Sequence, residues 1–130
     1  MCNLYSIYAS QADIRRAFGI DRDSSGNLPL LPAVFPDQMA PVVRSVDGQR
    51  ELIQMRWGFP PPPRAGNHVV TNVRNVSSPF WRAWLKPEFR ALVPLTSFSE
   101  FKDTRPRKTP IWFALSKDRP LAAFAGIWRP

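Results

Sequence analysis

Cys2 is the residue with the clearest chemical potential, because loss of the initiator Met1 would leave a cysteine with both a free α-amine and a thiol. An aldehyde can condense with such an amine to an imine, and the adjacent thiol can then close a five-membered thiazolidine ring. Reference pKa values of about 8 for the amine and about 8.5 for the thiol leave usable fractions of both nucleophiles near neutral pH. On its own, a cysteine after the initiator methionine is more often an accident of sequence, so other residues have to support this interpretation.

The remaining reactive side chains limit the chemistry. The chain has one Cys and one His, which excludes an intramolecular disulfide and argues strongly against a Cys/His zinc centre. We expect no metal and no organic cofactor, since an amine, a thiol and a carboxyl group suffice for the capture of an aldehyde. His68 lies in a Gly66-Asn67-His68 turn, where a solvated loop histidine is the favoured interpretation.

The composition favours one domain that binds a polyanion. The 130 residues are 44% hydrophobic, which suffices for one modest core. The 18 Lys and Arg residues outnumber the 10 Asp and Glu residues, and the net charge of +8 favours nucleic acid over a membrane surface as partner. No apolar run approaches the roughly 20 residues that span a bilayer, and residues 1–20 lack the pattern of a signal peptide, which predicts a cytoplasmic protein.

Hydrophobic patterns along the chain predict a β-rich α+β domain with two short helices. The expected strands span residues 3–8, 42–46, 51–57, 69–73, 91–94, 111–115 and 121–128. The expected helices run from Ser10 to Gly19 and from Ser78 to Pro87.

The segments between these elements are expected to be turns and loops. An Asp47-Gly48 turn closes a hairpin whose second strand ends at Trp57. The sequence predicts a long surface loop over residues 21–41 and a stiff connector at Pro60–Pro63. A basic loop carries Lys102, Arg105, Arg107 and Lys108.

Five short blocks follow one another in a specific order along the chain. They are Met1-Cys2, Arg56-Trp57-Gly58-Phe59, Thr71-Asn72-Val73-Arg74, Arg90-Ala91-Leu92-Val93-Pro94 and Ser97-Phe98-Ser99-Glu100-Phe101. In this order they resemble the SOS response-associated peptidase (SRAP) family. The resemblance covers the whole chain but only the N-terminal part of a family domain. It implies a mixed sheet or partial barrel in a single domain over residues 1–130, incomplete at its C-terminus.

The resemblance implies a role for each matching residue. Cys2 would be the N-terminal nucleophile that bonds to the ring-opened abasic deoxyribose, and Asn72 would hold that residue and the sugar in register. Glu100 would move protons during ring opening and imine formation. Arg74 would bind backbone phosphate, whereas Trp57 is equally well interpreted as a core residue or as a side chain that stacks on bases.

Two departures from the family pattern affect these roles. Asn3-Leu4 stand where the family commonly has Gly-Arg, so the missing phosphate contact is expected to come from residues such as Arg15, Arg16 or Arg82. The family's catalytic histidine lies in a C-terminal segment without a counterpart here, and His68 does not match it. Self-association or a completing chain is expected at the uncovered C-terminal edge.

Three functions are compatible with these observations. The leading hypothesis is covalent capture of abasic sites in single-stranded DNA during the SOS response, through a thiazolidine crosslink at Cys2, by a cytoplasmic, nucleoid-associated protein. The second is a thiol peptidase, a hydrolase that removes its own Met1 or cleaves other peptides, although Cys2 lacks a partner histidine. The third is a non-enzymatic remnant that binds DNA by charge.

Overall fold

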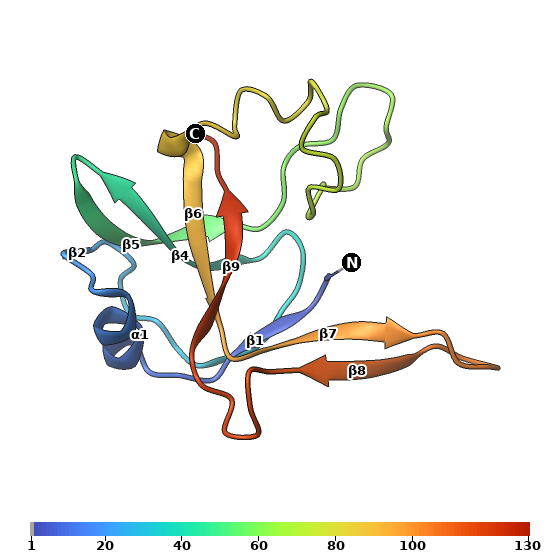
Figure 1. Cartoon of the computed structure of the whole chain (residues 1–130), viewed down its shortest axis with the longest axis horizontal. Helices are drawn as coiled ribbons and strands as arrows, with labels where there is room; N and C mark the ends of the chain where they lie inside the picture. Colours follow the sequence, from blue (N-terminus) through green and yellow to red (C-terminus); the bar gives the residue numbers. More distant parts are fainter. Residues whose placement is uncertain (1) are drawn as a thin grey trace.

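The computed structural model describes residues 2–130 and consists mainly of two β-sheets (Figure 1). The strands are β1 (Tyr5–Ile7), β2 (Arg22–Asp23), β3 (Leu31–Val34), β4 (Met39–Val46), β5 (Gln49–Arg56), β6 (Arg90–Leu95), β7 (Ser97–Lys102), β8 (Thr109–Phe113) and β9 (Ala122–Ile127). The helical elements are α1 (Gln11–Phe18) and η1 (Pro87–Phe89), a 3-10 helix. No helix in this part of the chain is long and apolar enough to cross a membrane.

The two sheets meet at a corner between β6 and β7. One sheet has the strand order β3-β1-β7-β8 and the other β2-β5-β4-β6-β9. The chain passes from one to the other at Thr96, whose buried hydroxyl donates to the carbonyl of Ser6 at 3.1 Å and accepts from the amide of Tyr8 at 3.0 Å. The sheets do not close into a complete barrel, which confirms the expected β-rich α+β class with a partial barrel.

Strand β1 lies at the centre of its sheet and of the core. It pairs antiparallel with β3 on one side and with β7 on the other, and all three of its residues are buried. The core consists of apolar side chains from both sheets and from α1: Tyr5, Ile7, Ile14, Val34, Ala40, Val43, Leu52 and Leu95. The segment from Tyr5 to Ile7 is therefore held by the sheet, as the apolar run after Cys2 predicts.

Two local predictions are confirmed in detail. Helix α1 begins after Ser10, whose side chain accepts a hydrogen bond from the amide of Asp13 at 3.1 Å, and it ends at Gly19 with a φ of 57°. Strands β4 and β5 form the predicted hairpin. Its Asp47 and Gly48 have φ values of 52° and 74°, as a two-residue type I′ turn requires.

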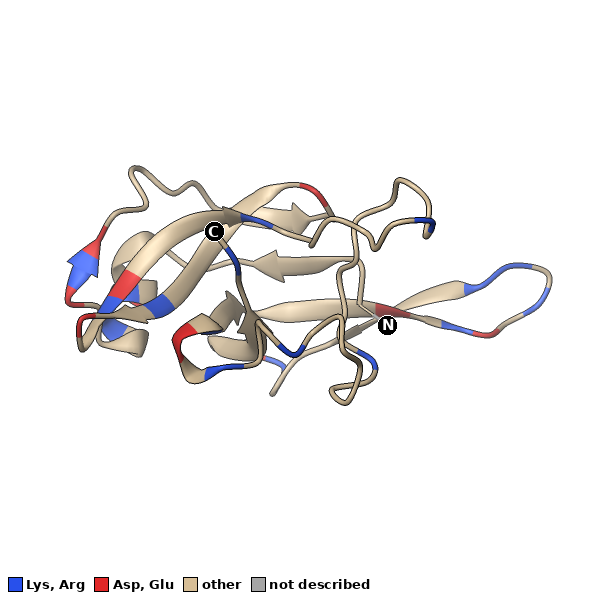
Figure 2. Ribbon diagram, turned by 90° about the horizontal axis from the view of Figure 1, so that it is seen from above, with Lys and Arg blue, Asp and Glu red and all other residues tan. Residues whose placement is uncertain are grey.

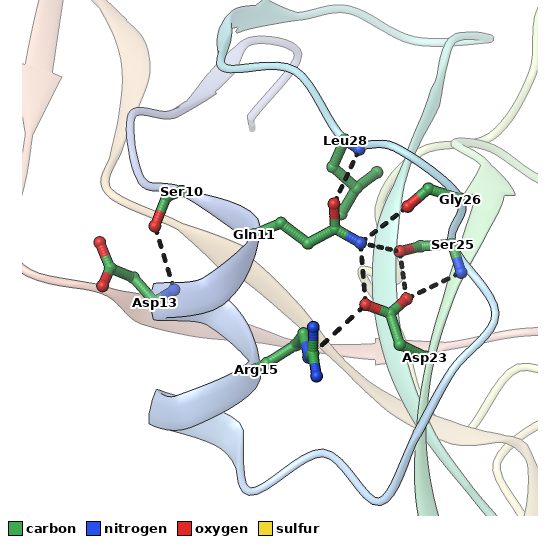
Figure 3. A network of polar contacts seen from close by, with 8 residues as sticks. All are labelled: Ser10, Gln11, Asp13, Arg15, Asp23, Ser25, Gly26 and Leu28. Carbon is green, nitrogen blue, oxygen red and sulfur yellow. Dashed lines mark hydrogen bonds and ion pairs between the residues drawn. The ribbon is translucent and has the colours of Figure 1, made fainter.

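The side chain of Gln11 connects α1 to the end of β2 and to the segment that follows it (Figure 3). Its side-chain nitrogen donates to the carboxylate of Asp23 at 2.8 Å and to the carbonyl of Gly26 at 2.7 Å, and its oxygen accepts from the amide of Leu28 at 3.1 Å. The side-chain amide of Gln11 thus forms hydrogen bonds with several backbone and side-chain groups. These bonds fix the conformation of this segment, which has little strand pairing.

The helix predicted from Ser78 to Pro87 is wrong, because this segment is not helical. Between Pro79 and Pro87 the chain forms tight turns, one of them closed by the amide of Trp84 and the carbonyl of Trp81 at 2.8 Å, and only the three-residue η1 follows. The rings of Trp81 and Trp84 instead pack edge-on against Phe59, with centroid distances of 5.4 and 6.2 Å. Aromatic packing in a segment bounded by prolines outweighs a weak helical pattern.

Three further expectations about strands need correction. The predicted loop over residues 21–41 contains β2, β3 and the start of β4. Residues 69–73 form only an isolated bridge, between Val70 and Phe59, in place of the predicted strand. Strand β7 was not predicted, because its buried residues Ser97 and Ser99 are polar and give no apolar alternation.

Candidate functional site

Cys2 lies three residues before the start of β1. Its side chain is half-buried, and its thiol donates to the carbonyl oxygen of Leu4 at 3.4 Å. The same carbonyl accepts from the amide of Ser99 on β7 at 2.9 Å. Cys2 is thus attached to a paired strand and its thiol has a defined orientation.

A chain of hydrogen bonds connects Cys2 to the segment around Asn72. The side-chain amide of Asn72 donates to the carbonyl oxygen of Cys2 at 2.9 Å and to the hydroxyl of Thr71 at 2.8 Å. The Thr71 hydroxyl in turn donates to the side-chain oxygen of Asn3 at 3.0 Å. The predicted association of Asn72 with the N-terminal residue is therefore present in the structure.

A close packing contact places the Thr71-Asn72 segment. Phe59 and Val70 exchange two backbone hydrogen bonds, of 2.9 and 2.8 Å. Gly58 has a φ of 119°, and a Cβ atom at this position would lie 2.7 Å from the Cβ of Val69. Only glycine fits both this conformation and this approach, so the segment before Asn72 can pack directly on the end of the β4–β5 hairpin.

Glu100 lies on β7, which runs beside the start of the chain. Tyr5 pairs with Phe98 in the antiparallel register, and continuation of this register brings Glu100 level with Asn3. Burial raises the pKa of the Cys2 thiol above its ordinary value, and the negative charge of the Glu100 carboxylate raises this pKa further. The structure therefore brings Glu100 close enough to Cys2 for an electrostatic interaction.

Trp57 packs on the core and remains partly accessible. One edge of the ring packs against Tyr5 in a T-shaped contact with a centroid distance of 5.1 Å, and its indole nitrogen makes a long hydrogen bond of 3.4 Å to the carbonyl of Thr71. The side chain is only half-buried and also lines a cavity beside Cys2. It is therefore both a support for the site and an accessible ring.

The cavity beside Cys2, here called the Cys2 cavity, has a volume of about 1390 Å³. Cys2, Trp57 and Asn72 lie in its wall, together with apolar residues of the second sheet. Among residues 2–130, every charged side chain in its lining is an arginine: Arg44, Arg56, Arg90 and Arg129. A half-buried thiol thus lies in the wall of a mainly apolar cavity whose charged side chains are arginines, two of which, Arg44 and Arg56, pair with Glu51 and Asp37.

Two of these arginines are held against tryptophan rings. The guanidinium of Arg44 lies 4.7 Å from the ring centroid of Trp128, and that of Arg129 lies 5.0 Å from the ring centroid of Trp84. Arg44 also forms an ion pair of 2.7 Å with the buried carboxylate of Glu51. The side chains of Arg44 and Arg129 are therefore held in place, and the Glu51 carboxylate compensates the charge of Arg44.

The predicted phosphate-binding residues lie outside this cavity. Arg74 and Arg82 are exposed and are not part of its lining, although Arg74 directly follows Val73, which is. Arg15 and Arg16 lie on α1, where they pair with Asp23 and Asp13. The lining arginines come from β4, β5, β6 and the segment after β9, so no spacing in the sequence indicated that they lie together.

The whole chain, residues 1–130, matches the family described as SOS response associated peptidase (SRAP). Three crystal structures have similar folds: a Bordetella bronchiseptica protein (TM-score 0.74, 23% identity), a phage-related protein from the same bacterium (0.71, 19%) and a Bacteroides thetaiotaomicron protein (0.64, 20%). The likeness to these proteins extends over 98%, 98% and 97% of this chain but over 64%, 62% and 59% of theirs. No curated protein matches the chain.

Proposed function

Because the chain belongs to the SOS response-associated peptidase family, we propose that it captures abasic sites in single-stranded DNA covalently through Cys2 after the loss of Met1. The observation that carries this proposal is the position of Cys2 in a cavity whose charged lining residues are arginines. An abasic sugar combines an aldehyde, which an N-terminal cysteine can bind, with flanking phosphates, which arginines attract. The protein acts in the cytoplasm, at the nucleoid.

The proposed reaction proceeds in two bond-forming steps. The ring-opened sugar presents an aldehyde, and the α-amine of Cys2 condenses with it to an imine with release of one water molecule. The thiol then adds its sulfur to the imine carbon and its proton to the imine nitrogen, which closes the thiazolidine ring. No oxidant, reductant or metal takes part, and the net change is the loss of one water.

The neighbouring residues have separate tasks in this proposal. Asn72 holds the backbone of Cys2 in the orientation needed for attack. Glu100 receives and returns protons during sugar opening and imine formation. Trp57 stacks against a base in the cavity, while the exposed Arg74 and Arg82 bind phosphates outside it.

The first experiment compares the wild-type protein with Cys2→Ser on an oligonucleotide that contains one abasic site. Removal of Met1 is confirmed for both proteins by intact mass. We expect a heat-stable crosslink on a denaturing gel for the wild type only. Cys2→Ser keeps the α-amine, so it should yield a band only after borohydride reduces the imine.

Two further results are decisive for this proposal. An oligonucleotide with a tetrahydrofuran analogue, which has no aldehyde, should give no band with either protein. Absence of a wild-type crosslink, or equal bands for both proteins without reductant, would show that Cys2 does not capture abasic sites.

A further inference from the structure

The hydrogen bonds around Thr71 run in one direction, from Asn72 to Asn3. The side-chain nitrogen of Asn72 donates to the carbonyl of Cys2 at 2.9 Å and to the hydroxyl of Thr71 at 2.8 Å. A hydroxyl group can accept and donate at the same time, and that of Thr71 donates to the side-chain oxygen of Asn3 at 3.0 Å. We call the side chains of Asn3, Thr71 and Asn72 the Thr71 network.

Together with the backbone, the Thr71 network forms a closed ring. It starts at the carbonyl of Cys2, passes through the Asn72 nitrogen and the Thr71 hydroxyl to the Asn3 side chain, and returns to Cys2 through the peptide bond between Cys2 and Asn3. Contacts at both ends of this short backbone segment restrict its rotation more than either contact alone would. The ring therefore fixes the orientation of the residue that would carry the α-amine.

The ring also fixes the side-chain amide of Asn72. Its two hydrogens bond to acceptors on different segments, Cys2 before β1 and Thr71 after the β4–β5 hairpin. Two such bonds define the plane of the amide, whereas one bond would allow it to rotate. Because Asn72 lines the Cys2 cavity, the fixed plane also determines where its oxygen can accept hydrogen bonds from reacting groups.

The backbone of Thr71 is held by contacts that do not involve its hydroxyl. Its carbonyl accepts the long hydrogen bond from the indole nitrogen of Trp57, and the preceding residue, Val70, exchanges two backbone hydrogen bonds with Phe59. Removal of the hydroxyl alone should therefore leave the path of this segment intact. Thr71 can thus be tested for positioning without loss of the fold.

From this ring we propose that Thr71 and Asn3 are positioning residues for the proposed capture reaction. Once Met1 has been lost, they hold the Asn72 amide, and through it the N-terminal Cys2, in the orientation for attack on an aldehyde. The inference rests on the proposed function for the identity of that aldehyde. It assigns a task to Asn3, which stands where the family commonly has glycine.

Thr71→Val keeps the shape of the side chain and removes its hydroxyl. At saturating abasic DNA, it should lower the rate of crosslink formation about three- to tenfold, as expected for the loss of hydrogen bonds that hold a reacting group. The DNA concentration that gives half the maximal rate should stay near the wild-type value, because orientation and not binding is affected. Thr71→Ser keeps the hydroxyl and should restore the rate.

Thr104→Val is the matched control, because it removes a hydrogen-bonded hydroxyl that lies outside the Cys2 cavity. Thr104 lies in the tip of the hairpin formed by β7 and β8. This tip projects from the body of the protein and carries the exposed cations of the predicted basic loop: Lys102, Arg105, Arg107 and Lys108 (Figure 2). Equal slowing by Thr71→Val and Thr104→Val would overturn the proposal.

Two double variants test whether Thr71 acts through its partners. Thr71→Val should slow the reaction no further when Asn72→Ala or Asn3→Ala is already present, because each change opens the same ring. Asn3→Asp should react like the wild type, since a carboxylate accepts the same hydrogen bond. Rate losses that multiply in both double variants would show independent effects and contradict the ring.

A small aldehyde separates this inference from the proposed function. Glycolaldehyde needs no DNA contact, and its adduct at Cys2 is followed by intact mass, with Cys2→Ser as the baseline for reaction at lysines. We expect Thr71→Val to slow this adduct by a factor similar to that for DNA. If it does so but abasic DNA gives no crosslink, capture fails and the positioning role stands. If Thr71→Val forms both products at the wild-type rate, the positioning role is wrong and capture stands.

Discussion

The side-chain amide of Asn72 donates a hydrogen bond of 2.9 Å to the carbonyl oxygen of Cys2, a residue 70 positions earlier in the chain. This contact links the only cysteine to the loop that follows the β4–β5 hairpin. It orients the backbone that would carry the α-amine, and it leaves the thiol free to hydrogen-bond elsewhere. Positioning of the N-terminal residue thus depends on a long-range contact in addition to its own strand.

Asn72→Ala should slow crosslink formation about 10- to 100-fold, because small errors in the orientation of reacting groups have large effects on rate. Single-turnover gel assays at saturating abasic DNA measure this rate. Asn75→Ala is the control, since Asn75 is exposed and its side chain accepts a local hydrogen bond from the amide of Ser77. Equal rates for Asn72→Ala and the wild type would remove Asn72 from the site.

In the chain that keeps Met1, the reactivity of Cys2 should rise with pH over a range above that of an ordinary thiol. Burial and the Glu100 carboxylate raise the thiol pKa, so the thiolate forms only as the pH passes this raised value. Alkylation by iodoacetamide, followed by mass spectrometry, reports on the thiolate directly because the chain has one cysteine.

Glu100→Gln should move this pH profile to lower pH, because it removes one of the charges that disfavour the thiolate. Asp103→Asn, on the exposed hairpin, is the charge-matched control and should leave the profile unchanged. A Glu100→Gln profile identical to that of the wild type would contradict the proximity of the two groups.

Gly58→Ala should destabilise the protein by about 1–3 kcal/mol, as measured by urea denaturation. The added Cβ would collide with Val69, and the positive φ of Gly58 disfavours any side chain. Gly66→Ala is the informative control, because Gly66 also has a positive φ but no atom lies within 4 Å of its added Cβ. A larger loss of unfolding free energy for Gly58→Ala than for Gly66→Ala would therefore report the close packing of Gly58 on Val69, in the segment that leads to Asn72.

Glu51→Gln should lower the free energy of unfolding by about 3 kcal/mol near neutral pH, since it leaves Arg44 and Arg22 without their buried counter-charge. Burial alone would raise the pKa of Glu51, but hydrogen bonds from Arg44, Arg22 and Ser24 outweigh burial and hold this pKa below its usual value. The stabilisation by the Glu51 carboxylate is thus fully present above the pKa that Glu51 has in the unfolded chain. It is lost as the pH falls through the lower pKa that Glu51 has in the folded protein.

The difference in the free energy of unfolding between the wild type and Glu51→Gln should therefore become smaller as the pH is lowered into the acid range. Asp13→Asn removes an exposed ion pair with Arg16 and should change stability by less than about 1 kcal/mol. A similar small loss for Glu51→Gln would show that the buried carboxylate contributes little to the fold.

Arg129→Gln should make binding of single-stranded DNA less sensitive to salt. Each phosphate contact contributes about 0.7 to the slope of log affinity against log salt for single strands. Fluorescence anisotropy at several salt concentrations should therefore give a slope that is smaller by about that amount. Arg16→Gln, on α1, is the control, and an equal change in both variants would mean that the Cys2 cavity does not hold the strand.

Local features of the fold were predictable because their signals lie within a few residues. Ser10 and Gly19 delimit α1, and Asp47-Gly48 set the turn between β4 and β5. Strands β2 and β3 gave no such signal. Their few residues are mostly polar or exposed, and pairing with other strands defines them.

The candidate site was predictable only in part. Cys2 was singled out by its own chemistry, Asn72 and Glu100 were identified by resemblance, and the structure brings both of them to Cys2. The arginines of the Cys2 cavity were missed, because strands far apart in the sequence bring them together. The segment after Ser78 was misread, since its aromatic spacing suits either a helix or a cluster of rings.

The central position of β1 also has a consequence for synthesis of the protein on the ribosome. Cys2 leaves the ribosome long before Asn72, but β1 acquires its second neighbour only when β7, which begins at Ser97, has been made. Asn72 likewise emerges long after its partner. The segment around Cys2 therefore acquires its native surroundings only after β7 has been translated, so the candidate site cannot form while β1 is the only one of the two strands outside the ribosome.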